Sequence, residues 1–356
     1  MSRFIQLHVL TSYPPSNLNR DDTGRPKTAV VGDSTRLRIS SQSLKRAWRT
    51  SDVFQAALKG HIGTRTKEMG ITVFDALIKS GVGEKNARDW SRLIASQFGK
   101  LKSDKKTANN EDLHVEQLVH FNPEEEKAIA DLVARLGSSN TAPNEDDLKL
   151  LRAQESAVDI AMFGRMLANT PKFNTEAAVQ VAHAITVNKA AVEDDYYTAV
   201  DDLNNGDTDR GAAHIGETGF GAGVFYLYVC INRELLQKNL GGDDALTRKS
   251  LDALIHAITK VSPTGKQNSF ASRAYAGFVL AEKGDQQPRS LAQAFLRPVT
   301  PDAKQGENTL TRAIGELSKR RDNFDKVYGA CADRKYEINV ETGDGNLLGL
   351  ADFAAG

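Results

Sequence analysis

Apolar and polar residues alternate in two short stretches near the N-terminus. Apolar side chains occupy every second position in residues 3–11 and again in residues 36–40. A period of two places such side chains on one face of an extended strand. Both stretches are therefore predicted to be β-strands. The segment between them, residues 11–35, is rich in turn formers and is predicted to be a long loop.

A helical pattern follows from Leu44 to about Lys59. Apolar residues recur at helical spacing, and a polar, basic set recurs two positions away, nearly opposite. The serines of residues 40–43 are suited to capping the start of this helix. One side of the helix is expected to pack, and the other to meet water or an anion. The packing set is Leu44, Ala47, Trp48, Ser51 and Phe54, and the polar set is Gln42, Lys45, Arg46 and Arg49.

Beyond residue 60 the pattern is mainly helical up to about residue 180. Residues 111–147 carry ten acidic residues against Lys127 and Arg135, which favours a helical insertion over a basic surface. The strand and helix order predicts an α+β core with this large insertion. A strand is expected within 175–190. An extended excursion over 192–232 follows, with a glycine-rich connection into the strand VFYLYVCI. The remaining elements are expected to be a helix at 246–260, a turn and strand over 260–282, and a late helix marked by Leu310 to Val327.

Composition narrows the possible classes of protein. The 356 residues include 46 Lys and Arg against 46 Asp and Glu, so any site for a polyanion must be a local patch. The two cysteines form no C-x-x-C pair, which argues against a disulfide scaffold or thiolate zinc site and fits a reducing compartment. The first residues make a poor signal peptide, and no apolar run has transmembrane length. We therefore expect a cytoplasmic protein without a membrane partner.

Positive charge is concentrated in RLRISSQSLKRAWR, residues 36–49, which holds five basic side chains and no acid. A helix N-terminus offers free N–H groups to an anion, and lysine and arginine side chains neutralise phosphates. A solvated helix face is the simpler explanation, but the lack of any acid favours an anion site. Arg36 and Arg38 are expected to add their charge from the preceding strand.

Other candidate chemistry is less specific. Asp21 and Asp22 could hold a divalent metal, but adjacent acids in a Gly/Pro loop more often form turns or pair with nearby arginines. Tyr196 and Tyr197 could stack on unpaired bases or simply close a hairpin. The glycine-rich stretch 216–223 fits neither a dinucleotide-binding motif nor a P-loop, and no serine-hydrolase or paired-histidine motif occurs. No metal and no cofactor is predicted.

Five blocks of sequence together resemble a known family. They are SNLNRDD (16–22), RISSQSLKRAWR (38–49), VDIAMFGRM (158–166), AHAITVNKAAVEDDYYTAVDD (182–202) and AHIGETGFGAGVFYLY (213–228). In this order they are similar to CasC, the repeated backbone subunit of the type I-E CRISPR surveillance complex Cascade, within the repeat-associated mysterious protein superfamily. The tail beyond about residue 285 matches less clearly.

The resemblance implies a hand-shaped α+β subunit. Its palm would be a modified RNA-recognition, ferredoxin-like fold, with helical fingers and a β-hairpin thumb. Copies would line up in a helical row along one CRISPR RNA, which pairs with target DNA, and each thumb would displace a base of the guide. The other partners implied are the large subunit, the small subunit, the guide-capping subunit and the repeat-cleaving endonuclease. The implied boundaries are palm 1–59, fingers 60–180, palm strand 181–191, thumb 192–223 and palm with C-terminal helices 224–356.

The resemblance also implies RNA-binding residues. The polar helix set would grip guide phosphates, Met166 would wedge against bases, and Tyr196 and Tyr197 occupy the position of an aromatic pair on the thumb. The full implied set is Arg20, Lys27, Arg38, Ser40, Gln42, Ser43, Lys45, Arg46, Arg49, Met166, Tyr196, Tyr197, Lys266 and Gln267.

The implied role is binding rather than cutting. The competing hypothesis is a metal-dependent endoribonuclease. Backbone subunits of related type III complexes cut RNA with an aspartate in the first palm loop, and Asp33 lies in a comparable loop.

Overall fold

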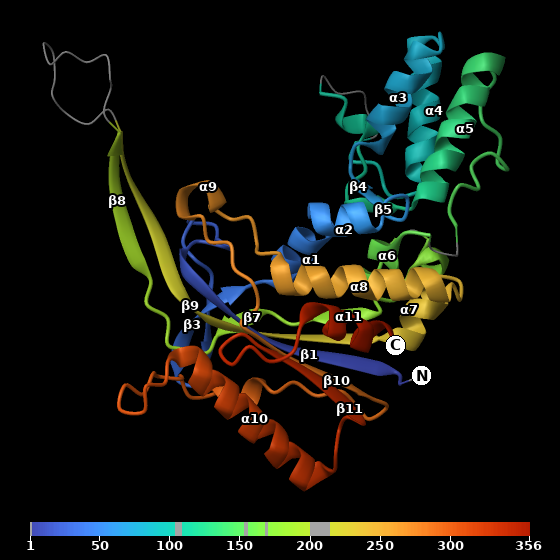
Figure 1. Cartoon of the computed structure of the whole chain (residues 1–356). Coiled ribbons are helices and arrows are strands. Elements are labelled where there is room, and N and C mark those ends of the chain that lie inside the picture. The colour runs from blue at the N-terminus through green and yellow to red at the C-terminus, as the bar shows by residue number, and fades with distance from the viewer. Residues whose placement is uncertain (1, 104–108, 153–155, 168–169, 200–213) are drawn as a thin grey trace, which may run out of the picture. The chain divides into compact units, whose positions relative to one another are not determined.

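The computed structural model describes residues 2–103, 109–152, 156–167, 170–199 and 214–356. The chain divides into two compact units (Figure 1). The sheet unit comprises Met1–Phe54, Gln180–Ile231 and Leu251–Gly356, and the helical unit comprises Gln55–Val179 and Asn232–Ser250. Each unit has its own hydrophobic core.

The sheet unit is built on a large antiparallel sheet that has nine strands within the described residues. Its main path runs β11-β10-β1-β9-β7-β3-β2, and β6 and β8 also pair with β9. The bounds are β1 (Phe4–Ser16), β2 (Thr28–Val31), β3 (Ser34–Ile39), β6 (Val179–Val181), β7 (Ala184–Thr186), β8 (Glu193–Ala199), β9 (His214–Asn232), β10 (Phe278–Gly284) and β11 (Arg334–Asn339).

Four central strands follow the order expected of the palm. They lie as β10-β1-β9-β7, which is the fourth, first, third and second of these strands along the chain. The chain passes through α1 (Ser41–Arg49) between β1 and β7, and through α8 (Asp244–Lys260) between β9 and β10. This is the β-α-β-β-α-β order of ferredoxin-like and RNA-recognition folds. The predicted α+β class is confirmed, and the strand order is consistent with an RNA-recognition-like palm.

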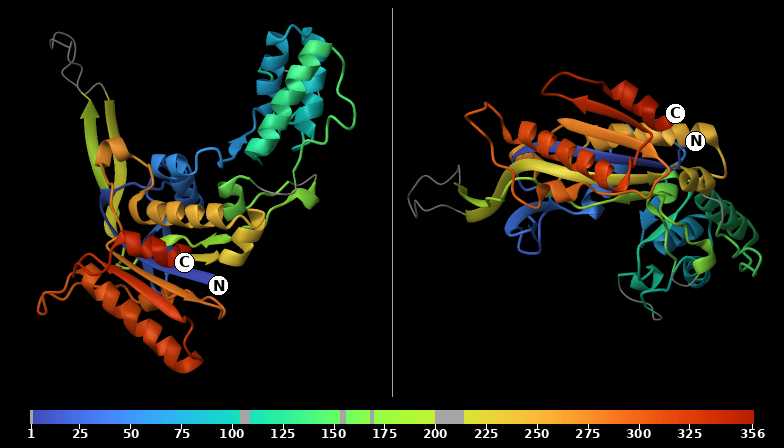
Figure 2. Two further views of the ribbon diagram at one scale, coloured as in Figure 1. Left: turned by 45° about the vertical axis from the view of Figure 1, so that its right-hand side comes forward. Right: turned by 90° about the horizontal axis from the view of Figure 1, so that it is seen from below.

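Different helices cover the two faces of the sheet (Figures 1 and 2). On one face, Leu10 and Leu280 share a core with Leu317 of α10 (Thr309–Tyr328). On the other face, the Lys283 ammonium lies 4.9 Å from the ring centroid of Phe353 in α11 (Leu347–Ala355). Because successive side chains of a strand point to opposite faces, β10 contributes to both layers.

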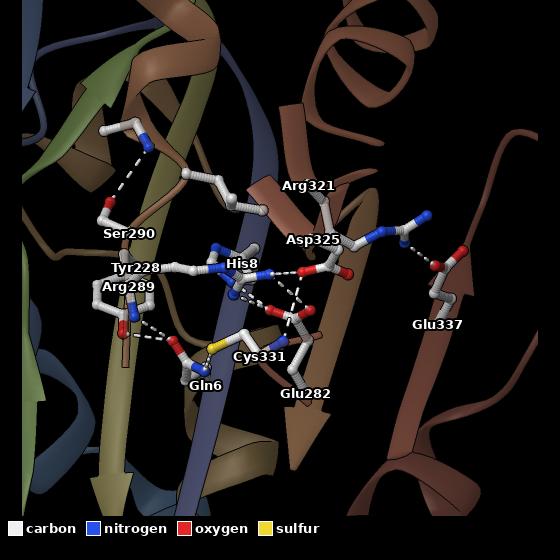
Figure 3. Close-up of polar contacts among 12 residues, drawn as sticks. Gln6, His8, Tyr228, Glu282, Arg289, Ser290, Arg321, Asp325, Cys331 and Glu337 are labelled. Carbon is white, nitrogen blue, oxygen red and sulfur yellow. Dashed lines mark hydrogen bonds and ion pairs between the residues drawn. The ribbon is translucent and has the colours of Figure 1, made fainter. Parts of the chain in front are cut away.

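A buried polar network lies on the α10 face (Figure 3). His8 contacts the Tyr226 hydroxyl at 2.9 Å through Nδ1 and the Glu282 carboxylate at 3.1 Å through Nε2. Arg289 donates to the same carboxylate at 2.6 Å, and its backbone N–H donates to Gln6 at 2.7 Å. These bonds fasten the segment after β10 to β1 and β9. Two further short helices of this unit are α9 (Gln267–Phe270) and the 3₁₀ turn η3 (Ala292–Phe295).

The helical unit is held by a core that includes Leu77, Trp90 and Leu136. Its longest helix begins with a capping box, in which Asn122 and Glu125 bond each other's backbone N–H groups. The elements are α3 (Met69–Lys79), α4 (Glu84–Ser96), α5 (Pro123–Ser139), α6 (Val158–Phe163) and α7 (Arg233–Asn239), the paired strands β4 (Thr64–Thr66) and β5 (Val119–Phe121), and the 3₁₀ turns η1 (Glu111–Leu113) and η2 (Pro171–Phe173).

Two of the predicted element boundaries were wrong. The single helix expected over residues 44–59 is two helices, α1 and α2 (Asp52–Ala57). Ser51 separates them, because its hydroxyl donates to the Trp48 carbonyl and accepts from the Phe54 N–H. The long loop expected over residues 11–35 is also shorter. β1 continues to Ser16, since proline is compatible with extended backbone at its end, and β2 pairs with β3.

The glycine-rich stretch 216–223 is part of β9 and not a connection into it, which corrects a third prediction. A Cβ at Gly221 would lie 2.8 Å from a Leu37 methyl, so glycine here allows close packing of the strand. The predicted thumb, 192–223, includes β8 and the start of β9, and its central residues 200–213 lie outside the described residues. Within the part of the chain described, none of the helices combines the length and the apolar character that spanning a membrane requires.

Candidate nucleic-acid interface

The start of α1 is fixed by two polar side chains. The Ser40 hydroxyl accepts from the Ser43 N–H at 3.3 Å, and Asn19 accepts from the Ser40 N–H at 2.8 Å. Leu44 and Trp48 are buried beneath the helix. The polar side of α1 is therefore turned outward, next to the loop of residues 17–27.

An open cavity of about 470 Å³ lies between this loop and α1. Arg20, Ser43 and Arg46 line it together, so three of the implied residues share one surface. Neither guanidinium has a hydrogen bond or ion pair with any described residue. An anion entering the cavity would meet two guanidinium groups that are not engaged in ion pairs with described residues, beside the carboxylates of Asp21 and Asp22. The complete lining is Leu18, Asn19, Arg20, Asp21, Asp22, Gly24, Ser43, Arg46, Ala47, Thr50, Thr264 and Gly265.

Asp21, which also lines the cavity, acts as a turn former. Its carboxylate accepts from the Thr23 hydroxyl at 2.8 Å, the Thr23 N–H at 2.9 Å and the Arg25 N–H at 3.0 Å. These bonds, led by that from the Thr23 hydroxyl, lower the pKa of Asp21. Of the two roles expected for these acids, turn formation or pairing with nearby arginines, Asp21 takes the first. The Arg25 guanidinium pairs at 2.8 Å with Asp194, at the base of β8.

Lys27 and Arg38 form a second cationic group, next to His183. Arg38 Nη1 lies 3.0 Å from His183 Nδ1, and the Arg38 backbone N–H donates to the Lys27 carbonyl at 2.8 Å. Burial lowers the pKa of His183, and the positive charges of Arg38 and Lys27 lower it further. His183 is therefore neutral at physiological pH and can accept a hydrogen bond from Arg38.

Arg36 does not belong to this surface, which corrects the expectation that it adds to the patch. Its side chain is fully buried, and its Nη atoms donate to the carbonyls of Thr186 at 2.9 Å, Val187 at 2.6 Å and Phe295 at 2.9 Å. The charge of Arg36 is satisfied inside the sheet unit, because the backbone after β7 and in η3 covers this face of β3.

The remaining implied residues of α1 and α9 differ in exposure. Gln42 is exposed, whereas Lys45 and Arg49 are half-buried, and burial lowers the pKa of Lys45. Lys266 adopts a left-handed conformation, φ 51°, and Gln267 donates to the Pro263 carbonyl at 2.8 Å. α9 is tied to the loop of the cavity because Gly265 packs directly on the Leu18 backbone.

The two tyrosines of β8 point to opposite faces of the β8–β9 hairpin, as neighbours on a strand must. Tyr196 is 65 % exposed. The ring of Tyr197 lies across Gly216, its partner on β9, where an added Cβ would come within 2.3 Å of the ring. The structure thus presents Tyr196 outward and uses Tyr197 to cover the neighbouring strand, so the two rings do not form one stacking surface.

Met166 belongs to the helical unit. Its side chain is 76 % exposed and lines a small cavity of about 130 Å³ together with Leu118, which is 50 % exposed. An exposed thioether beside an exposed leucine is an apolar contact surface. The neighbouring Arg165 is buried and bonds Glu125 at 2.7 Å, which holds the backbone that presents Met166.

A family model described as CT1975-like protein matches residues 5–352. The chain belongs to the CT1975-like family. Its structure is similar to a chain of a solved structure described as "CRISPR RNA-guided surveillance complex, pre-nicking", with a TM-score of 0.83, 28% identity and 99% of each chain covered. A chain of a "CRISPR RNA-guided surveillance complex" shares the fold, with a TM-score of 0.74, 23% identity and 99% of each chain covered. None of the curated proteins matches.

Membership of the CT1975-like family, together with the fold shared with these complexes, confirms the resemblance to a CRISPR backbone subunit that the five sequence blocks indicated. Residue patterns did not reveal Asn19, His183, Thr264 and Gly265 as parts of the cationic surfaces. Asn19 stands within one of the quoted blocks, but its bond to Ser40 spans 21 residues, so no local capping signal could have indicated it. His183, Thr264 and Gly265 are brought in by strand pairing and packing, which no local pattern reports.

Proposed function

We propose that this CT1975-like protein is a non-catalytic scaffold subunit of a type I-E CRISPR surveillance complex. It binds the phosphates of a CRISPR RNA, lines up with copies of itself along that guide and presents the guide to target DNA. Its other partners are the large, small, guide-capping and repeat-cleaving subunits, and it works in the cytoplasm. The similar chain from a complex described as RNA-guided supports this proposal.

The observation that carries the proposal is the cavity shared by Arg20, Ser43 and Arg46. It combines two guanidinium groups that pair with no described residue and the N-terminus of a nine-residue helix. Both features attract an anion, and they act on the same volume. A guide phosphate is the ligand that matches, because the chain has no net charge and its positive groups are gathered locally.

Salt-dependent RNA binding tests the role of α1. In the variant Lys45→Ala, Arg46→Ala, Arg49→Ala, we expect weaker binding of a labelled single-stranded RNA. The slope of log affinity against log salt should fall by about 0.7 for each phosphate that the variant no longer neutralises. The control is Lys304→Ala, Lys319→Ala, Lys326→Ala, which removes three exposed lysines of the same unit away from the cavity. Fluorescence anisotropy at several salt concentrations measures both.

Equal slopes for the wild type and the α1 variant would contradict the proposal. An equal decrease in affinity in both variants would also contradict it, because binding would then depend on overall charge and not on this surface.

A further inference from the structure

A second open cavity, of about 530 Å³, lies in the helical unit and takes no part in the proposed RNA interface. It is a groove between α3 and α5, which rise together with α4 above β4 and β5 in Figure 1. Residues at helical spacing on each helix form its sides. Those of α3 are Met69, Thr72, Val73, Ala76 and Ser80 at its end, and those of α5 are Glu126, Ile129, Ala130, Val133 and Ala134.

The groove is closed at one end and floored by apolar side chains. At the closed end the helices touch, since a Cβ at Gly137 would lie 2.5 Å from the Ser80 Cβ. From there the groove extends to Phe121 of β5. Its floor includes Val73 and Ile129, which belong to the core of the unit but border the groove. Both side chains are buried, and the residues along the mouth of the groove, such as Ala130, are small and exposed, so no large side chain covers the floor.

Two carboxylates stand at this apolar groove. Glu68, just before α3, and Glu126, in the first turn of α5, both line it. Neither side chain has a hydrogen bond or ion pair with any residue that the structure describes. Phosphate groups of a nucleic acid or an anionic lipid would be repelled here. The groove is therefore suited to a segment whose apolar side faces the floor and whose positively charged side chains lie on either side of it, beside Glu68 and Glu126.

We propose that this groove docks an amphipathic helix of a partner protein, with its apolar side on the floor and lysine or arginine side chains beside Glu68 and Glu126. The two stripes of α3 and α5 present ridges at helical spacing, which a third helix can complement. Such a helix would complete a packing surface that α3 and α5 leave open. This inference is independent of RNA binding, because it involves neither α1 nor the loop of residues 17–27.

A pair of helical peptides tests the proposal with the full chain. Both are fluorescein-labelled and carry leucine at positions i, i+3, i+4 and i+7. One has lysines flanking this stripe, and the other has glutamates. We expect the lysine peptide to bind about tenfold more tightly, because it makes attractive and not repulsive charge pairs. In Glu68→Lys, Glu126→Lys the preference should reverse.

Two further variants separate the groove from a general effect. Ala130→Trp should fill the groove and abolish binding of the lysine peptide. Asp131→Trp, at an exposed neighbouring position that does not line the groove, should leave it unchanged. The proposal is wrong if the wild type does not distinguish the peptides, if the charge reversal does not reverse the preference, or if Ala130→Trp binds as the wild type does. RNA affinity, measured in parallel, should stay constant in Ala130→Trp, which changes the groove without changing the net charge.

Discussion

Arg36 and Arg38 stand two residues apart on β3, on the same side of the strand, in very different surroundings. Arg36 is fully buried and donates to backbone carbonyls, whereas Arg38 lies at the surface and contacts His183. Burial of a guanidinium is costly unless hydrogen bonds compensate it, and here both Nη atoms are bonded while Nε is not. Arg36 therefore fastens backbone segments together, while Arg38 is available to a ligand.

The first prediction follows from this difference. Replacing Arg36 by methionine leaves the carbonyls of Thr186, Val187 and Phe295 without their donor, which should lower the free energy of unfolding by about 3 kcal/mol. Arg38→Met is the matched control and should change it by less than about 0.5 kcal/mol. Urea denaturation of the free protein measures both. Similar decreases in the two variants would show that burial of Arg36 has no special role.

His8 and Glu282 make the stability of the sheet unit depend on pH. Burial lowers the pKa of His8 from 6.5, so the folded protein holds it neutral, while an unfolded chain binds a proton below pH 6.5. Burial acts to raise the pKa of Glu282, but the bonds from His8 and Arg289 outweigh it and lower the pKa to about 2, from 4.5. Both shifts mean that the unfolded chain binds more protons, so stability decreases as the pH falls.

The second prediction separates the two groups by pH. The His8 contribution should be lost as the pH falls below about 6.5, and that of Glu282 as it falls below about 4.5. His8→Gln keeps one acceptor for Tyr226 and one donor for Glu282 but does not titrate. We expect the unfolding free energy of the wild type to fall between pH 7 and pH 5 and that of His8→Gln to change less. Parallel curves for the two proteins would contradict a neutral, buried His8.

At the scale of elements, α1 shows what a local pattern can and cannot predict. Its buried side and its polar side follow from helical spacing, and its capping serine from residue type alone. Its end at Arg49 depends on the hydroxyl of Ser51, which a count of helix formers does not reveal. The burial of Arg36 likewise depends on backbone from distant segments, 186–187 and residue 295, which period-two alternation cannot report.

The β8–β9 hairpin gives the third prediction. Tyr197 covers Gly216, and such cross-strand contacts contribute about 0.2–1 kcal/mol. Tyr197→Ala should therefore speed amide hydrogen exchange in β8, by up to about fivefold. Tyr196→Ala should leave exchange unchanged, because its ring is mostly exposed. If the proposed function is right and this ring stacks on a base of the guide, the same variant should weaken RNA binding. If the two variants behave alike in both measurements, the opposite placement of the rings has no functional meaning.

At the scale of the whole molecule, the net charge is zero, but charges of one sign are clustered on particular surfaces. The helix α1 presents basic side chains and no acid, whereas Glu193, Asp194 and Asp195 at the base of the hairpin are all exposed acids, of which Asp194 pairs with Arg25. A phosphate backbone would be attracted to the first surface and repelled by the second. Only part of this distribution could be predicted from the sequence. The sequence blocks indicate the family and the basic stretch of α1. The grouping of Lys27, Arg38 and His183 depends on strand pairing, which the sequence blocks do not report.

The last prediction is that the protein does not cut nucleic acid. Cleavage of a phosphodiester needs a metal or an acid–base pair aimed at the scissile group. Asp21 uses its carboxylate to hold a turn, and Asp33 is an exposed residue of the β2–β3 turn whose carboxylate accepts from Ser34 at 3.0 Å. We therefore expect complementary RNA and DNA to stay intact when incubated with the guide-loaded protein and magnesium or manganese. Asp33→Ala, the matched variant, should bind RNA as the wild type does. Regularly spaced cuts that disappear in Asp33→Ala would establish the endoribonuclease instead, because only an aspartate that takes part in the chemistry would remove cleavage without removing binding.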